Sequence, residues 1–266
     1  MRSVLKPNNS YILITIVITL YLHSGCARSD ALDQAATPAL KPPPPEIIAK
    51  ADQLFGERKD LSKLREAISL LQKVRSENSR SYEVEWRFAR YNYFLGRHTN
   101  DDKESDKAFE DGKAAAKVAR QLEPNRPEGH FWYGANLGEQ ADRSPVTVGL
   151  KSINEIRESM NRVIQIQPDY ELASSYGVLG KIELETYGLM GGDLDKAVEY
   201  LQKAIDLEKN NGDLYLDLAE TYLERKQPVE AKKQLQLVLQ IKPHPEYLPE
   251  YEQQVVKARE MLRSRF

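Results

Sequence analysis

The sequence predicts an all-α protein built from repeated helical hairpins, and three observations lead to this fold class. Apolar residues recur at three- and four-residue spacing from Glu46 almost to the C-terminus, which is the period of an amphipathic helix. Turn-forming residues interrupt the pattern, for example at Pro124, Pro168 and Gly212. No alternating strand pattern of any length is present in the sequence. We therefore expect one helical repeat domain over residues 46–266.

The composition supports a folded domain and argues against several functions. Hydrophobic residues make up 41% of the 266 residues, which is enough for a sizeable core. The net charge is -2, and 38 Lys and Arg residues are interleaved with 40 Asp and Glu residues. Nucleic-acid-binding domains carry a basic patch or stripe, so we expect no nucleic-acid partner.

Residues 1–25 have the pattern of an export signal. A basic start at Arg2 and Lys6 precedes an apolar run from Tyr11 to Leu22, and small residues follow it. The run is shorter than the ~20 residues that span a bilayer comfortably. The alternative is an N-terminal membrane anchor that is not cleaved.

The end of this segment, Ser24-Gly25-Cys26, resembles a bacterial lipobox. The resemblance implies that the Cys26 sulfur carries a lipid and that the peptide before it is removed. The sequence departs from the pattern at His23, where the family prefers leucine. A single cysteine in an exported protein is otherwise unexplained. Ala27, rather than aspartate, implies a lipid anchor in the outer membrane, on the periplasmic side of the cell envelope.

Residues 26–45 are expected to be the lipidation site and a proline-rich tether. They contain few large apolar residues and end in the run Pro42–Pro45, which favours polyproline II. Such a segment would hold a domain away from a membrane, although a plain linker has the same composition.

The helical region divides into five expected helix pairs and a C-terminal capping helix. The expected helices cover residues 46–55, 61–74, 82–95, 106–122, 127–140, 148–166, 171–186, 193–207, 213–225, 228–241 and 250–262. Asp106 suits a helix start because its carboxylate can accept from first-turn N–H groups. Pro228 suits a first turn, where its missing N–H has no partner in any case.

The last pair resembles the 34-residue tetratricopeptide (TPR) motif, position by position. The matching positions are Tyr215, Leu218, Ala219, Tyr222, Ala231, Leu235, Val238 and Pro243. Small residues such as Ala219 and Ala231 let two helices cross closely, while larger side chains fill the space around them.

The signature of the second helix recurs along the chain. Its first members are Ala67, Gly112, Ile156, Ala197 and Ala231, which lie 45, 44, 41 and 34 residues apart. The extra residues fall in TNDDKESD, ADRSPVTVGLKS and ETYGLMGG, which are either binding features or neutral drift. In the third repeat the small position is either Gly134 or Asn136.

A narrower resemblance covers residues 128–262. The stretches GHFWYGANLGE, SINEIRESMNRVIQIQPDY and YGLMGGDLDKAVEYLQKAIDL resemble the TatT component family, periplasmic TPR lipoproteins associated with TRAP-type transporters. The resemblance implies a tethered accessory protein that docks a solute-binding protein, or a cavity for an apolar ligand. Similar layouts occur in a eukaryotic microtubule-associated repeat family, so layout alone does not fix the partner.

Catalytic and metal-binding motifs are not found in the sequence. The four histidines lie far apart, Cys26 has no second cysteine, and there is no phosphate loop or nucleophile elbow. We therefore expect no enzyme, no metal and no cofactor.

Two clusters are the candidate binding residues. Three adjacent aromatic residues, Phe131, Trp132 and Tyr133, cannot all face one core, because neighbours on a helix are ~100° apart. Asn136 on the same helix needs partners if it is buried. Tyr187, Leu189 and Met190 lie in a glycine-flanked turn, as a binding lip or a plug. Plain packing of Trp132 and Tyr133 against adjacent helices is the alternative.

Three functions remain open. The first is a membrane-tethered scaffold for a partner protein, which the family resemblance implies is a solute-binding protein. The second is a carrier or chaperone of a small apolar ligand near Trp132. The third is a general assembly factor of the cell envelope. Homo-oligomerisation is also left open.

Overall fold

The computed structural model describes residues 44–75, 80–144 and 149–266. The predicted signal, Cys26 and nearly all of the predicted tether lie outside these residues. In the part of the chain that is described, no helix is both long and apolar enough to cross a bilayer.

The described residues form five helix pairs followed by a final helix, which confirms the predicted fold class. The pairs are α1 (Pro45–Gly56) with α2 (Leu61–Val74), α3 (Tyr82–His98) with α4 (Asp102–Leu122), α5 (Pro127–Arg143) with α6 (Leu150–Ile166), α7 (Tyr170–Glu185) with α8 (Leu194–Leu207), and α9 (Gly212–Glu224) with α10 (Pro228–Val238). A short 3-10 helix, η2 (Pro245–Tyr247), leads into α11 (Leu248–Arg265).

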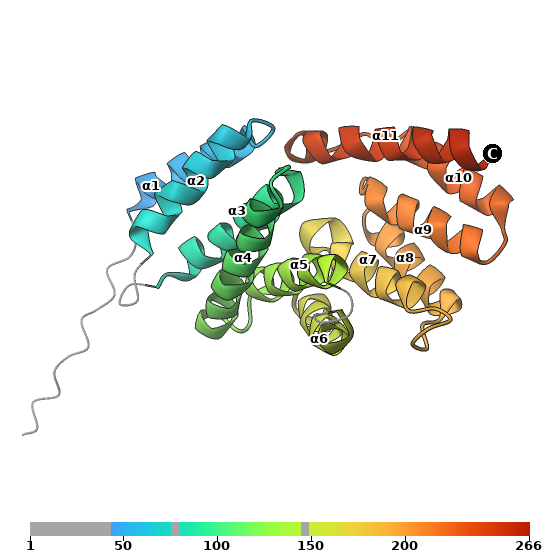
Figure 1. Cartoon of the computed structure of the whole chain (residues 1–266), viewed down its shortest axis with the longest axis horizontal. Helices are drawn as coiled ribbons and strands as arrows, with labels where there is room; N and C mark the ends of the chain where they lie inside the picture. Colours follow the sequence, from blue (N-terminus) through green and yellow to red (C-terminus); the bar gives the residue numbers. More distant parts are fainter. Residues whose placement is uncertain (1–43, 76–79, 145–148) are drawn as a thin grey trace, which may run out of the picture. The chain divides into compact units, whose positions relative to one another are not determined.

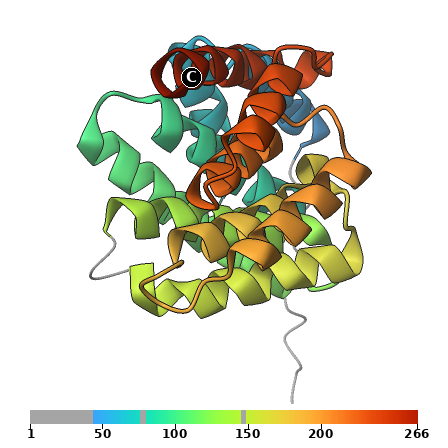
Figure 2. The same ribbon diagram turned by 90° about the vertical axis from the view of Figure 1, so that its right-hand side faces the viewer.

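Successive pairs pack side by side in chain order (Figure 1). The final helix α11 packs on α9 and α10 and extends toward the turn between α1 and α2 (Figure 1). Figure 2 shows the molecule from the side on which the C-terminus of α11 lies. The chain therefore brings its last helix back to its first repeat.

Side-chain caps begin the helices α2, α4, α8 and α9, and the start of α4 departs from the sequence-based expectation. Pro228 lies in the first turn of α10, as predicted. Helix α4, however, begins at Asp102 rather than Asp106, because the Asp101 carboxylate accepts from the backbone N–H groups of Lys103 and Glu104. The segment TNDDKESD therefore adds a turn to α4 instead of forming a loop.

Small residues mark the close helix crossings. Ala219 and Ala231 are both fully buried between α9 and α10. In the third pair the small position is Gly134, because a Cβ there would lie 2.4 Å from the Met160 Cε atom of α6. Asn136 points away from α6, toward the preceding pair. The structure thus resolves the register left open by the sequence.

The buried apolar residues form two clusters. The first cluster takes its members from α1 to α7, and the second takes its members from α7 to α11. Ile164 and Tyr200 are partly buried against both clusters and join them. The described apolar residues of α11 that belong to a cluster or pack against one do so in the second cluster.

The first turn of α7 is left-handed. Glu171, Leu172 and Ala173 have φ values of 47°, 57° and 59°. For residues with a Cβ this conformation costs roughly 1–2 kcal/mol each. The fold must therefore hold this turn in place through other contacts.

Candidate partner-binding site

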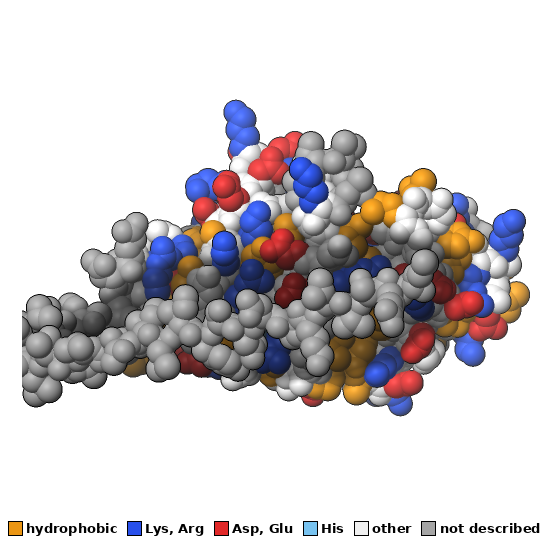
Figure 3. All heavy atoms as spheres, turned by 90° about the horizontal axis from the view of Figure 1, so that it is seen from below, with side chains coloured by type: hydrophobic (Ala, Val, Ile, Leu, Met, Phe, Trp, Pro, Cys, Tyr) orange, Lys and Arg blue, Asp and Glu red, His pale blue; other side chains and the backbone are white. Residues whose placement is uncertain are grey.

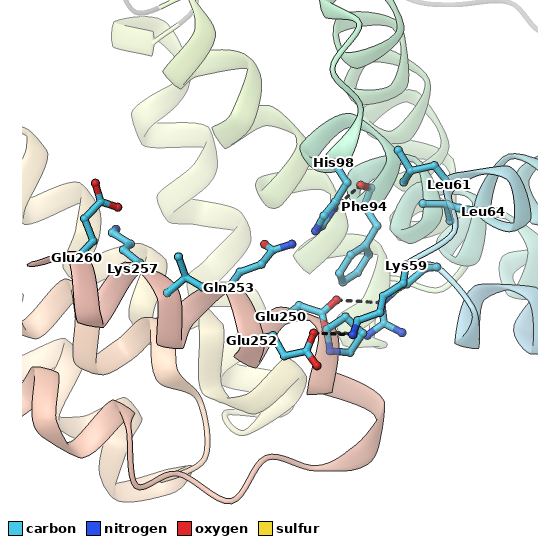
Figure 4. Close-up of a pocket in the computed structure, with 13 residues that line it drawn as sticks. Lys59, Leu61, Leu64, Phe94, His98, Glu250, Glu252, Gln253, Lys257 and Glu260 are labelled. Atoms are coloured by element: carbon cyan, nitrogen blue, oxygen red, sulfur yellow. Dashed lines mark hydrogen bonds and ion pairs between the residues drawn. The ribbon is translucent and has the colours of Figure 1, made fainter.

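The candidate site is a groove between α11 and the first two helix pairs, called the α11 groove below. It encloses about 520 Å³. One wall comes from the start of α2 and the end of α3, and the other from one face of α11 (Figure 4). The residues that define the two walls are Leu61, Leu64, Phe94 and His98 on one side and Pro249, Gln253, Val256 and Glu260 on the other.

The α11 wall is a single helix face. Pro249, Gln253, Val256 and Glu260 follow one another at three- and four-residue spacing, which places them on one side of a helix. The Gln253 side chain points across the groove toward Phe94 and His98 (Figure 4). This wall is therefore regular and about three turns long.

The opposite wall is apolar and fixed by local contacts. Leu64 and Phe94 are buried members of the first cluster. The His98 ring stacks on Phe94 with centroids 6.1 Å apart, and its Nδ1 lies 2.7 Å from the Phe94 carbonyl oxygen. Contacts within the protein therefore hold this wall in place, and we call it the apolar floor of the groove.

Charged side chains form the rims of the groove. Lys59 pairs with Glu252 across the groove, with 2.5 Å between Nζ and Oε2. Lys257 pairs with Glu220 of α9 at 3.0 Å. Figure 3, the view from below and thus from the side away from α11, shows Lys and Arg side chains interspersed with Asp and Glu side chains there as well. The groove thus combines an apolar floor with mixed charge at its edges.

Arg58 closes one end of the groove. Its side chain is only 4% exposed, and its Nε and Nη2 donate to the Glu250 carboxylate at 2.9 and 2.8 Å. Nη2 also donates to the Glu246 carbonyl, and the guanidinium lies 4.7 Å from the Phe55 ring centroid. One arginine in the turn between α1 and α2 therefore joins the first helix pair to both η2 and α11.

A second charged group lies next to Arg58. Arg90 of α3 pairs with Glu246 at 2.8 Å and lies 3.6 Å from Glu171, and Tyr247 donates to Glu171 at 3.0 Å. Burial raises the pKa of Glu171, while Arg90 and the Tyr247 hydroxyl act in the opposite direction. Glu171 belongs to the left-handed turn of α7, so these contacts hold that turn.

A second hollow of about 530 Å³ lies on the other side of Arg58. Its lining includes Trp86, Arg87 and Arg90 on one side and Pro245 and Leu248 on the other. Arg58 and Pro249 line both hollows. The contact between α11 and the first repeats is therefore bordered by space on both sides.

The three predicted aromatic residues are all buried members of the first apolar cluster, so the expectation that they cannot all face one core is wrong. Trp132 is 2% exposed, packs on Tyr93 and Phe94 of the preceding pair, and donates from Nε1 to the Tyr170 hydroxyl at 3.1 Å. Phe131 also packs on Tyr170. Their own protein neighbours thus occupy the faces that a ligand would need, and a binding role for them stays a prediction.

Tyr133 and Asn136 are the other two predicted site residues on α5, and both make hydrogen bonds within the protein. The Tyr133 hydroxyl donates to Glu155 at 2.6 Å, and Arg120 stacks over its ring. The Asn136 amide donates to the carbonyls of Trp132 and Ala89, at 2.7 and 3.3 Å. Asn136 is therefore a buried polar bridge between α5 and α3.

Tyr187 and Met190 lie elsewhere, in the turn between α7 and α8, and are about half exposed. Leu189 between them is 86% exposed. The turn is ordered by amide donors to the Thr186 carbonyl and by positive φ at Gly188 and Gly191. The exposure of Leu189 argues against a plug over the core, and a binding role for this turn stays a prediction.

Sequence reasoning missed the residues of the α11 groove. Arg58 and Glu250 are 192 positions apart, and their pairing follows only from the return of α11 to the first repeat. The one local signal was the helix face Gln253, Val256 and Glu260, where an apolar residue sits between polar ones. Conversely, the predicted lipidation site Cys26 lies outside the described residues.

Comparisons with known proteins agree with the fold. The family model described as "Regulator of microtubule dynamics protein 1-3" matches residues 47–190, which is 144 of 266 residues and more than half of the chain. A tetratricopeptide repeat model matches residues 189–248. Curated protein sequences gave no match.

Solved structures of TPR proteins are also similar. TTC0263, a thermophilic TPR protein of Thermus thermophilus, is 18% identical with a TM-score of 0.59, over 81% of this chain and 98% of that chain. MamA is 17% identical with a TM-score of 0.47, over 76% of this chain and 95% of that chain. The first of these supports the fold alone.

These findings confirm a TPR protein, and none of them names a transporter-associated family. The match of the family model covers most of the first four helix pairs, and this shows the family of the chain. The chain belongs to the family described as Regulator of microtubule dynamics protein 1-3, and its last repeat is a tetratricopeptide repeat.

Proposed function

We propose that this protein is a membrane-tethered, non-enzymatic scaffold that binds a partner protein in the α11 groove. The observation that carries the proposal is the groove itself: a volume of about 520 Å³ with an apolar floor and rims of mixed charge. The curvature of stacked repeats creates extended concave surfaces, which proteins of this class use to bind partners. TPR families are generally scaffolds without catalytic chemistry.

The dimensions of the groove suit a polypeptide segment. Pro249 and Glu260 are 11 residues apart on α11, which corresponds to about 16 Å along a helix. About five residues of an extended chain cover the same length. Apolar side chains of such a segment would contact the accessible parts of Leu61 and Val256, while its polar groups would meet Lys59 and Glu252.

The proposed partner is a soluble solute-binding protein of the periplasm. The TatT resemblance of residues 128–262 supports this class of partner. The lipobox-like Ser24-Gly25-Cys26 and the run Pro42–Pro45 support a lipid anchor in the outer membrane and a spacer. We expect the anchor to keep the scaffold at the membrane while its partner diffuses.

Two other candidates each have one specific observation in their favour. The family description names microtubule dynamics, so a microtubule component is a second candidate partner. The groove volume also falls in the range of ~300–1,000 Å³ typical of small-molecule sites, which favours a carrier of an apolar ligand.

The test compares two exposed valines. Val256 lies in the α11 groove and is 63% exposed, whereas Val229 on α10 lies outside its lining and is 76% exposed. The probes are the purified solute-binding protein encoded nearest to this gene and polymerised tubulin, with affinity measured by biolayer interferometry and co-sedimentation. We expect Val256→Asp to weaken binding of the solute-binding protein at least tenfold, and Val229→Asp to leave it unchanged.

Three results would contradict the proposal. Equal effects of the two substitutions would exclude the groove as the site. Binding of tubulin but not of the solute-binding protein would favour the second partner. Co-purification of a stoichiometric apolar ligand, seen by native mass spectrometry, would favour the carrier.

The tether has its own test. Cys26→Ser should move the protein from the membrane fraction to the soluble fraction of the envelope. Unchanged fractionation would show that lipidation of Cys26 is not the anchor.

A further inference from the structure

The contact that joins α11 to the first repeats is almost entirely polar. It consists of Arg58 with Glu250, Lys59 with Glu252, and Arg90 with Glu246. Tyr247 adds its hydrogen bond to Glu171. When a buried ion pair of this kind separates, both charges return to water, and their hydration offsets much of the lost attraction. Separating packed apolar surface has no such compensation.

The rest of α11 is held differently. Ala258 is fully buried in the second cluster, and Met261 and Leu262 pack against the same cluster. None of the described residues of α11 belongs to the first cluster. The helix is therefore part of the apolar core of the last repeats, and only charges and hydrogen bonds join it to the first ones.

Two further features make this contact easy to open. The hollows of about 520 and 530 Å³ border Arg58, so few packed atoms would have to separate. Tyr247 and Arg90 also hold Glu171, the first residue of the strained left-handed turn of α7. Strain in a backbone segment persists only where surrounding contacts hold it, so opening would free this turn.

We propose that η2 and the first turns of α11 form a latch that closes the α11 groove. When the latch opens, α11 stays with the second apolar cluster and separates from residues of the first cluster. In the closed form Arg58 and Glu250 join the first and last repeats. In the open form the first two helix pairs move away from α11, which widens the groove for a partner segment. This regulation rests on the proposed function, but the opening itself is a property of the free protein.

The experiment measures a distance inside the full-length chain. Spin labels are placed at Ser69→Cys on α2 and Arg259→Cys on α11, two exposed positions outside the latch, in a Cys26→Ser background. Pulsed electron resonance then gives the distribution of distances between the labels. We expect Glu250→Gln to raise the population of longer distances at least tenfold.

Glu104→Gln is the matched control. Glu104 also accepts two hydrogen bonds from one arginine, Arg65, but it joins α2 to α4 and not to α11. We expect this substitution to leave the distribution unchanged. An unchanged distribution in Glu250→Gln, or an equal broadening in both variants, would overturn the latch.

A second pair of variants covers the case in which Glu250→Gln does not fold. Lys59→Glu should add longer distances, and the exchanged pair Lys59→Glu/Glu252→Lys should remove them. No difference between these two would overturn the proposal. The distances are measured without a partner, so loss of binding at Val256 and loss of the latch are separate outcomes.

Discussion

The two ends of α11 are held by opposite kinds of chemistry. The C-terminal half packs Ala258 into the second apolar cluster, where α9 and α10 form the most regular repeat of the chain. The N-terminal half, with η2, meets the first repeats through Arg58 and Arg90 and their carboxylate partners. Hydrophobic burial is non-directional and grows with area, whereas ion pairs depend on geometry and on the exclusion of water.

This difference separates permanent structure from adjustable structure within one helix. An apolar end anchors the helix to its own repeat, and a polar end can make or break contact with a distant one. The sequence of α11 reflects the division, because Glu250 and Glu252 precede the stretch that contains Ala258, Met261 and Leu262. We expect the free energy of unfolding to depend more on the apolar half of α11 and its cluster than on the polar half.

The largest effect is expected in the apolar half. Leu235 of α10 is fully buried in the second cluster, so Leu235→Ala should lower the free energy of unfolding by about 3 kcal/mol. Leu239→Ala, four residues on at an exposed position, is the matched control and should cost less than about 1 kcal/mol. Urea denaturation followed by circular dichroism measures both. Equal losses would mean that the second cluster is not the anchor of α11.

A smaller effect is expected in the polar half. Glu250→Gln keeps the shape of the side chain but removes the charge that Arg58 pairs with, and should cost about 1.5 kcal/mol. Glu252→Gln removes a charge from an exposed pair and should change the free energy of unfolding by about 0.5 kcal/mol or less. If Glu250→Gln cost as much as Leu235→Ala, the comparison between the two ends would fail.

Local sequence patterns predicted the helices and their pairing because the period of apolar residues and the turn residues are local signals. The match at Ala219, Ala231 and Pro243 found the most regular repeat for the same reason. Asp106 was a wrong helix start, since Asp101 offers the same capping chemistry five residues earlier and extends α4.

The candidate site could not be predicted in the same way. The adjacent aromatic residues around Trp132 are conspicuous in the sequence, yet all three are buried against other residues of the protein. The α11 groove depends on the total rotation of the successive helix pairs, which brings α11 back to Arg58. Many packing contacts along the chain each contribute to this rotation, so no short sequence motif predicts it.

A last test concerns the charged face of α9 beneath α11. Asp213, Asp217 and Glu220 share this face, and α11 contacts two of them, through Gln254 at 2.9 Å from Asp213 and Lys257 at 3.0 Å from Glu220. Burial raises the pKa of Asp217 to about 7, with Asp213 and Glu220 acting in the same direction and Lys181 and Lys257 opposing them.

The sign of the effect follows from proton binding. The folded state keeps a proton on Asp217 that the unfolded state releases above about pH 4, so the free energy of unfolding falls as the pH rises toward and through 7. Asp217→Asn removes this dependence. Because water still reaches the carboxylate, we expect the variant to be more stable than the wild type by about 1 kcal/mol at pH 8 and about equal to it near pH 4.

Urea denaturation at several pH values measures this difference, with Asp169→Asn at an exposed position as the control. Parallel pH profiles for the wild type and Asp217→Asn would show that the face of α9 is open enough to hydrate its charge fully. The contact between α11 and α9 would then accommodate charged groups as easily as the contact between α11 and Arg58. The contrast between an apolar anchor and a polar latch would have to rest on Ala258 and its neighbours alone.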